Sequence, residues 1–232
     1  MKTLTNSDFL DLWERGVGLH PLDQGLLILG AGLPGTSYES MADWPLGRRN
    51  AALAQLHCAC FGSSIQAWTA CDQCGAKLEL DLDGRSLTDR SPVTEPVAAR
   101  GHSFRLPTTR DLAAAAREAD SDSAAIRLLE SCCFEAGEPD RWSEEEVEEV
   151  GQKMALADPM AEIQLTLTCP ECESECSSAL DIASFLWEEI GARAKRLLRE
   201  VHDLASAYGW TEREVLSLNE YRRAIYLGMV RE

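Results

Sequence analysis

Two Cys-x-x-Cys motifs are the residues of this chain best suited to chemistry. The first is Cys71-Asp-Gln-Cys74 and the second is Cys169-Pro-Glu-Cys172. Together they supply four thiolates, the ligand set that a structural zinc ion takes in tetrahedral geometry. The motifs therefore predict a structural Zn²⁺ site with Cys71, Cys74, Cys169 and Cys172 as its ligands. Such a site stabilises a fold and performs no reaction.

The separation of the two motifs is unusual. Between Cys74 and Cys169 lie 94 residues, whereas compact zinc ribbons place their pairs about 15 to 20 residues apart. Each motif adjoins a segment in which apolar and polar residues alternate, as in a strand with one buried face. We therefore expect residues 63–83 and 161–181 to form the two halves of a zinc-ribbon-like antiparallel sheet. The alternating apolar residues are Leu78, Leu80, Leu82, Ile163, Leu165 and Leu167.

Redox chemistry and disulfides are the alternatives to zinc for these cysteines. A redox dithiol becomes reactive at the start of a helix, where its pKa is lowered, and neither motif opens a helical pattern. The first residues, Met1-Lys-Thr-Leu-Thr-Asn, lack a secretory signal pattern. We therefore expect a cytoplasmic location, where disulfides do not persist. If the purified protein held no zinc, a disulfide between Cys71 and Cys172 would replace the zinc interpretation.

The other cysteines are expected to be small buried residues. Cys60 continues an apolar helical face, and Cys132 and Cys133 continue an apolar run. The segment His57-Cys58-Ala-Cys60 suggests a second metal site only weakly, because no further ligand cluster accompanies it. Cys176 follows Cys172 by four residues and either replaces it as a ligand or packs inward. The two-residue gap of a Cys-x-x-Cys motif favours Cys172.

Composition excludes several classes of protein. The net charge is −17, so the chain repels a nucleic-acid backbone instead of neutralising it. No segment reaches the roughly 18 to 20 apolar residues of a membrane span. One basic cluster, formed by Arg193, Lys195, Arg196 and Arg199, lies on a helical face. We expect it to meet carboxylates within the chain or on a protein partner.

Helix signals dominate the rest of the chain. Residues 1–62 carry helical segments with Asn6 or Ser7 as the first N-cap, and residues 101–160 carry a strand and further helices. Residues 182–232 contain the strongest helix, capped by Asp181 and ended by Gly209. Residues 84–100 contain turn residues without a period and are expected to form an exposed loop. Reciprocal capping boxes are expected at Thr108 with Asp111, Ser143 with Glu146, and Thr211 with Glu214.

These patterns predict an α+β fold: a mostly helical single domain over residues 1–232 with a small antiparallel zinc-bound sheet. Common catalytic motifs for hydrolases, nucleotide binding and zinc proteases are missing from the sequence. The four histidines, His20, His57, His102 and His202, lie far from one another and from the cysteine motifs along the chain. We therefore expect a protein that is not an enzyme.

A family resemblance is carried by segments spread over nearly the whole chain. They are Phe9-Leu-Asp-Leu-Trp-Glu-Arg-Gly16, Leu46-Gly-Arg-Arg-Asn50, Phe61-Gly62, Phe104-Arg-Leu-Pro-Thr108, Leu165-Thr-Leu-Thr-Cys-Pro-Glu-Cys172 and Leu180-Asp-Ile-Ala-Ser-Phe-Leu-Trp187. In these segments the chain resembles the T-even-phage-type baseplate hub assembly chaperones, whose relatives occur with contractile phage tails and extracellular contractile injection systems. The second cysteine motif and the segment after it are the most specific part.

The resemblance implies a cytoplasmic bacterial protein, without catalytic activity, that helps the central baseplate hub to assemble. Its partners would be hub, spike or tube proteins, and its zinc ligands would be Cys71, Cys74, Cys169 and Cys172. The chain departs from the family at Asp72 and in Glu173-Ser-Glu-Cys176. A resident baseplate subunit of the finished particle is the first alternative. A zinc-ribbon regulator that binds nucleic acid and an enzyme with structural zinc are the others.

Overall fold

The long helix α8 (Ile182–Tyr208) forms the axis of the molecule. In the computed structural model, which describes residues 1–88, 95–135 and 142–231, α8 carries the main core on one face. Asp181 caps the helix by accepting hydrogen bonds from the backbone N–H groups of Ala183 and Ser184, and left-handed Gly209 ends it. Both ends of this helix are confirmed. Its fully buried residues include Leu186, Ile190, Ala194, Leu197 and Leu204.

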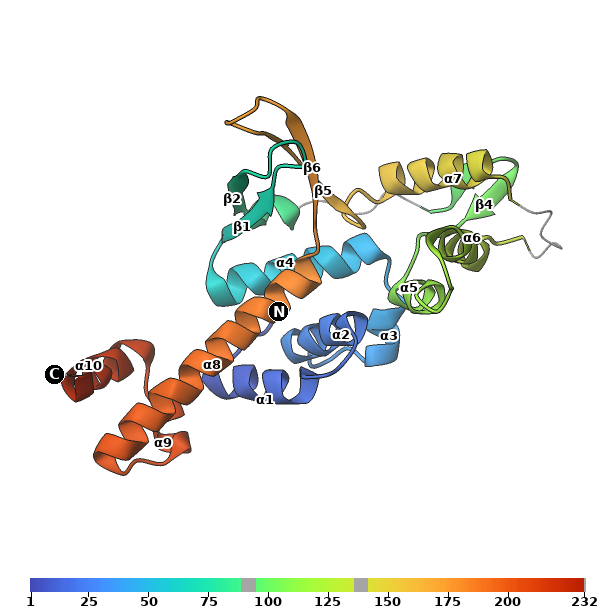
Figure 1. The fold of residues 1–232 in the computed structure, drawn as a ribbon. Coiled ribbons are helices and arrows are strands. Elements are labelled where there is room, and N and C mark those ends of the chain that lie inside the picture. Colours follow the sequence, from blue (N-terminus) through green and yellow to red (C-terminus); the bar gives the residue numbers. More distant parts are fainter. Residues whose placement is uncertain (89–94, 136–141, 232) are drawn as a thin grey trace.

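Three of the first four helices pack against α8, whereas the short third one packs against the second (Figure 1). The four helices are α1 (Asn6–Gly16), α2 (Pro21–Gly32), α3 (Tyr38–Ala42) and α4 (Leu46–Phe61). The predicted cap of the first helix was wrong by one or two residues. Thr5 has an extended backbone and forms a capping box with Asp8: its hydroxyl accepts a hydrogen bond from the Asp8 N–H, and the Asp8 carboxylate accepts one from the Thr5 N–H.

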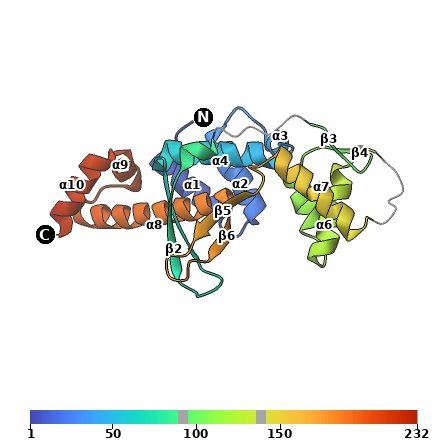
Figure 2. The same cartoon turned by 90° about the horizontal axis from the view of Figure 1, so that it is seen from above.

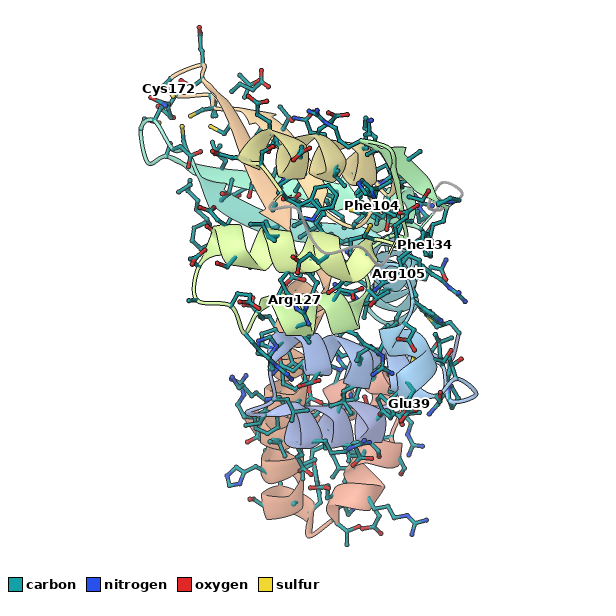
Figure 3. All side chains as sticks on the ribbon, turned by 90° about the vertical axis from the view of Figure 1, so that its right-hand side faces the viewer. Glu39, Phe104, Arg105, Arg127, Phe134 and Cys172 are labelled. Atoms are coloured by element: carbon teal, nitrogen blue, oxygen red, sulfur yellow. The ribbon has the colours of Figure 1, made fainter. Side chains whose placement is uncertain are left out.

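Two β-hairpins extend together from this helical layer (Figures 1 and 3). The first consists of β1 (Ser64–Ala70) and β2 (Lys77–Asp83), and the second of β5 (Ile163–Thr168) and β6 (Glu175–Leu180). Both are antiparallel, and their last pairs before the turn are Ala70 with Lys77 and Thr168 with Glu175. The hairpins form two separate two-stranded sheets instead of the single sheet that was expected.

A second layer of structure lies at one end of the molecule, opposite α9 and α10 (Figure 2). It contains β3 (Val97–Ala99), β4 (His102–Phe104), α5 (Thr109–Ala115), α6 (Ser121–Cys132) and α7 (Glu144–Ala157). These elements enclose a small core of their own. That core includes Val97, Phe104, Leu106, Leu129, Cys132 and Val150.

The expected exposed loop over residues 84–100 is partly wrong. The 3-10 helix η1 (Gly84–Leu87) places Leu87 in the main core, and β3 places Val97 and Ala99 in the small core. Leu87, Val97 and Ala99 are buried by apolar contacts with distant segments, and these contacts cannot be predicted from the local sequence. Residues 89–94 lie outside the described residues.

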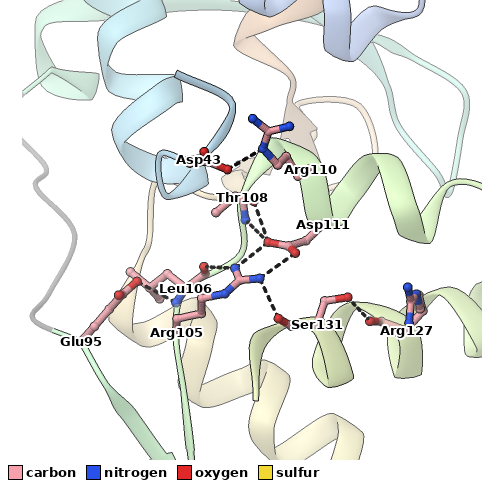
Figure 4. A network of polar contacts seen from close by, with 9 residues as sticks. All are labelled: Asp43, Glu95, Arg105, Leu106, Thr108, Arg110, Asp111, Arg127 and Ser131. Carbon is pink, nitrogen blue, oxygen red and sulfur yellow. Dashed lines mark hydrogen bonds and ion pairs between the residues drawn. The ribbon is translucent and has the colours of Figure 1, made fainter. Parts of the chain in front are cut away.

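A charged network closes the start of α5 (Figure 4). Arg105 donates two hydrogen bonds to the Asp111 carboxylate at 2.6 and 2.8 Å, and a third to the backbone oxygen of Ser131. Asp111 also accepts hydrogen bonds from the N–H and hydroxyl of Thr108, the reciprocal pair that was predicted. The network joins β4, α5 and α6.

The chain ends in α9 (Glu212–Ser217) and α10 (Glu220–Arg231), which fold back against the end of α8. The predicted capping box of Thr211 and Glu214 is present. Arg223, almost fully buried on α10, donates a hydrogen bond to Glu200 of α8 at 2.6 Å. The fold is therefore a mostly helical α+β domain, as predicted. Among the described helices, none is both long and apolar enough to cross a membrane.

Candidate metal centre

The two cysteine motifs form matching turns at the tips of the hairpins. The backbone oxygen of Cys71 accepts a hydrogen bond from Gly75 at 2.8 Å, and that of Cys169 accepts one from Glu173 at 2.9 Å. The N–H of each of these cysteines also bonds across its turn, to Ala76 and Ser174 respectively. The residue after each motif is left-handed, with φ of 73° at Gly75 and 59° at Glu173. Each turn thereby directs its two sulfur atoms to one side.

The four predicted ligands come together between the hairpins. The Sγ atoms of Cys71 and Cys172 are 3.6 Å apart, as are those of Cys74 and Cys169. All four lie within 4.8 Å of one another. Four thiolates at about 2.3 Å from a tetrahedral metal ion are separated by about 3.8 Å. The four sulfur atoms therefore fit one tetrahedral metal ion.

Backbone N–H groups stabilise negative charge on these sulfurs. The N–H groups of Cys74 and Gln73 lower the pKa of Cys71 to about 6. Hydrogen bonds from Ser174 likewise lower the pKa of Cys172. The Ala76 N–H acts in the same direction on Cys74, but burial and the neighbouring sulfurs outweigh it and raise that pKa to about 12. A divalent cation at the centre would relieve this repulsion, since a coordinating thiol is deprotonated outright.

Cys176 lies beside the four ligands and outside their group. It is 4% exposed, and its thiol donates a hydrogen bond to the Cys71 sulfur at 3.4 Å. It packs with Leu78 in the small apolar cluster beneath the hairpin tips. Of the two uses left open by the sequence, the structure favours inward packing.

The site is closed to substrates by its own ligands. Cys71 and Cys169 are buried, while Cys74 and Cys172 lie at the exposed tip labelled in Figure 3. All nine cysteines are free thiols, and β2 and β6, not helices, follow the two motifs. Four sulfur ligands leave no open coordination position, which is the arrangement of a structural metal site.

The remaining sequence candidates are placed elsewhere. His57 is fully buried, with its Nε2 atom 2.7 Å from a carboxylate oxygen of Glu189. Among the residues that the structure describes, the segment from His57 to Cys60 belongs to no group of possible metal ligands. A different group of possible ligands does come together from His102, Cys133 and Glu135. Sequence reasoning missed it, since His102 is distant along the chain and the only local signal is the close spacing of Cys133 and Glu135.

Comparison of the chain with protein-family models, with curated proteins and with solved structures gives no match.

Proposed function

We propose that this protein is a non-enzymatic, protein-binding factor that assists assembly of the baseplate hub of a contractile phage tail-like injection system, and that a structural Zn²⁺ on Cys71, Cys74, Cys169 and Cys172 holds its two hairpins together. Zinc is the metal that four thiolates in tetrahedral geometry favour. The hub, spike and tube partners rest on the family resemblance of the sequence.

The exposed apolar face of α10 is the observation that carries the protein-binding part of the proposal. Tyr221, Ile225 and Met229 are 78%, 42% and 59% exposed. They recur every four residues, so they form one stripe along the helix. Gly228, next to the stripe, has open space where a side chain would lie. This face suits a partner helix that approaches closely with apolar residues of its own.

The surfaces expected from sequence need revision. The sequence also offers the N-terminal helices with Leu12 and Trp13 as a contact surface, but Leu12 is 2% exposed and both residues pack in or against the main core. Arg193 has a side chain only 13% exposed and pairs with Glu220 at 2.9 Å. Arg196 and Arg199 remain exposed on α8, as does Lys195. These three cations and the α10 stripe are the proposed partner surface, and acidic groups on the partner would complement the cations.

The alternatives differ in what they require. A resident baseplate subunit would use the same surface and stay in the finished particle. A nucleic-acid-binding regulator would need a basic face, which a net charge of −17 disfavours. An enzyme would need a polar catalytic cluster in a cleft. The first alternative therefore competes most closely with the assembly factor.

Co-purification from a strain that produces the particles tests the proposal. The wild-type chain should capture hub, spike or tube proteins. Mass spectrometry of finished particles then distinguishes an assembly factor from a resident subunit. Absence from particles indicates an assembly factor, whereas stoichiometric presence indicates a subunit. Met229→Asp should reduce capture, and Leu156→Asp, at an exposed leucine on α7, is the matched control. Failure to capture any hub, spike or tube component would refute both the assembly-factor and the resident-subunit hypotheses.

A further inference from the structure

The elements β4 and α6 lie at one end of the molecule, away from the cysteine tip (Figures 1 and 3), and a second group of metal-ligand side chains comes from β4 and the residues after α6. It consists of His102 on β4, Cys133 directly after α6, and Glu135 two residues further on. One nitrogen, one sulfur and one carboxylate oxygen from these residues all lie within 4.8 Å of one another. The group shares no residue with the four-cysteine site.

Backbone pairing holds the three residues opposite one another. Phe104 and Cys133 form an antiparallel bridge. The N–H of Arg105 donates to the oxygen of Cys132, and the N–H of Phe134 donates to the oxygen of Ser103, both at 2.9 Å. Continuing this register places His102 across from Glu135. Main-chain hydrogen bonds therefore fix this juxtaposition.

The ligand atoms have nearly the spacing of a coordination shell. The Cys133 Sγ atom is 3.6 Å from Glu135 Oε2, and His102 Nδ1 is 3.9 Å from the same oxygen. Around a tetrahedral zinc ion, sulfur and oxygen ligands are about 3.6 Å apart and nitrogen and oxygen ligands about 3.4 Å apart, given usual metal–ligand distances. A small movement of the His102 ring would complete the shell.

The surrounding groups orient these ligands. The N–H of Ser103 donates to Glu135 Oε2 at 2.9 Å, which positions the carboxylate. The His102 ring packs edge-on against Trp142, with ring centroids 5.3 Å apart, and near Phe104. Hydrogen bonds and apolar walls of this kind fix ligand orientation around metal ions. The three side chains are partly exposed, so a metal ion can reach them from solvent.

We propose that His102, Cys133 and Glu135 form a second, exchangeable metal site for a divalent transition metal such as Zn²⁺ or Co²⁺. An imidazole, a thiolate and a carboxylate together suit metals of intermediate softness and disfavour Mg²⁺ and Ca²⁺. Three protein ligands leave one tetrahedral position open to water, in contrast to the closed four-cysteine site. The second ion therefore binds more weakly than the first and exchanges with solvent.

Cobalt titration of the full chain tests this site. The protein is first loaded with one equivalent of Zn²⁺, and Co²⁺ is then added while thiolate-to-cobalt absorption and released zinc are both measured. The wild type should bind one further equivalent, with a charge-transfer band and without zinc release. Cys133→Ser should remove the band. Glu135→Gln should keep it and weaken binding by at least about tenfold, the smaller end of the loss seen when metal-site partner groups are removed.

Cys58→Ser is the control, because Cys58 is a partly exposed thiol outside both ligand groups. It should leave the second equivalent unchanged. The proposal is overturned if the wild type takes up cobalt only as zinc is released, if it binds no second equivalent, or if the band persists in Cys133→Ser. Glu135 is exposed, so Glu135→Gln provides a folded variant even if Cys133→Ser folds poorly.

Discussion

At the residue scale, the turns of the two cysteine motifs differ at the position after the second cysteine. Gly75 and Glu173 have the same left-handed backbone conformation, which costs a residue with a side chain roughly 1–2 kcal/mol and costs glycine little. The first turn therefore uses the residue that fits, whereas the second turn holds a glutamate under strain. Metal binding and turn formation are coupled, so this strain should appear in the metal affinity.

Gly75→Ala should consequently weaken zinc binding about tenfold, because about 1.4 kcal/mol of backbone strain opposes formation of the turn. An added Cβ at Gly75 meets no atom within 4 Å, so crowding does not contribute. Glu173→Gly should raise the affinity by a comparable factor, because it removes the same strain from the second turn. Competition with a chromophoric chelator measures both. Gly151→Ala, which adds a methyl group in open space on α7, is the control, and an equal loss there would contradict the explanation.

The cysteines themselves give a second residue-scale prediction. Cys169→Ser removes a ligand and should lower the zinc content from about one equivalent to well below it, because an incomplete thiolate shell binds the ion weakly. Cys176→Ser should retain the metal, since Cys176 lies outside the four-sulfur group. Elemental analysis of freshly purified, reduced protein measures this. If Cys176→Ser lost zinc while Cys172→Ser kept it, the choice of fourth ligand would be wrong.

The short spacing within each Cys-x-x-Cys motif made the four-cysteine site predictable. The group of His102, Cys133 and Glu135 has no such motif, so it was not predicted. A Cys-x-x-Cys motif is a local signal of converging sulfurs, and the structure brings both pairs together. His102 and Glu135 meet only through the pairing of β4 with the segment after α6. Cys176 had no decisive local signal either, because its inward direction depends on the register of β5 with β6.

At the scale of elements, α4 is joined to the start of the second hairpin by a close backbone contact. The N–H of Gly47 donates to the Asp158 carboxylate at 2.8 Å, and Asn50 donates to the backbone oxygen of Met160 at 2.8 Å. A Cβ atom on Gly47 would overlap that carboxylate. The glycine at this position therefore allows the chain after α7 to lie against the first turn of α4.

Gly47→Ala should thus lower the free energy of unfolding by about 2–3 kcal/mol, the cost of overpacking a tightly packed site. Urea denaturation monitored by circular dichroism measures the loss. Gly35→Ala is the matched control, because a Cβ there meets open space. A loss at Gly47 no larger than at Gly35 would show that the carboxylate moves aside without cost.

The network at the start of α5 predicts a dependence of stability on pH. Burial by itself raises the pKa of Asp111, but hydrogen bonds from Arg105 and Thr108 outweigh burial and lower the pKa below its usual value of 3.8. The folded state therefore favours the ionised carboxylate. This contribution to stability is present above the unfolded pKa and is lost as pH falls through the folded pKa.

Asp111→Asn should accordingly destabilise the protein at neutral pH, and its deficit relative to wild type should shrink on acidification through the usual aspartate range. Denaturant unfolding at a series of pH values gives this difference directly. Asp11→Asn, at an exposed aspartate on α1, controls for the loss of one charge. A deficit that stays constant over the whole series would exclude the ionised Asp111 as its source.

Elements were predictable where their signals are local. The capping boxes at Thr108, Ser143 and Thr211 and the stop at Gly209 depend on residues within one helical turn, and all are present. The prediction for residues 84–100 was partly wrong because Leu87 and Val97 are buried by distant partners. The division of the expected sheet into two hairpins also depends on contacts that only the folded chain provides.

At the scale of the whole molecule, the proposed metal would join the two hairpin tips, which lie outside the main core although Ile65 and Ile163 at the bases of the hairpins belong to it. The buried cluster around the cysteines, with Leu78, is separate from the main core around α8. The two hairpins share no strand pairing, and an isolated two-stranded hairpin is marginally stable in water. We therefore expect the metal to hold the hairpin tips together while the helical layer is stabilised by its own apolar contacts.

Removing the metal with a chelator should open the tips and leave the helices folded. Amide hydrogen exchange measured by mass spectrometry should become faster around Gly75 and Glu173, whose N–H groups close the two turns. Exchange in the middle of α8, where Leu186 and Ile190 are fully buried, should stay slow. Helix α2 serves as the internal control, because it holds no residue of either ligand group. Loss of protection throughout α8 would instead mean that the metal stabilises the entire domain. The cysteine cluster and the main core would then unfold together, although they are separate in the structure.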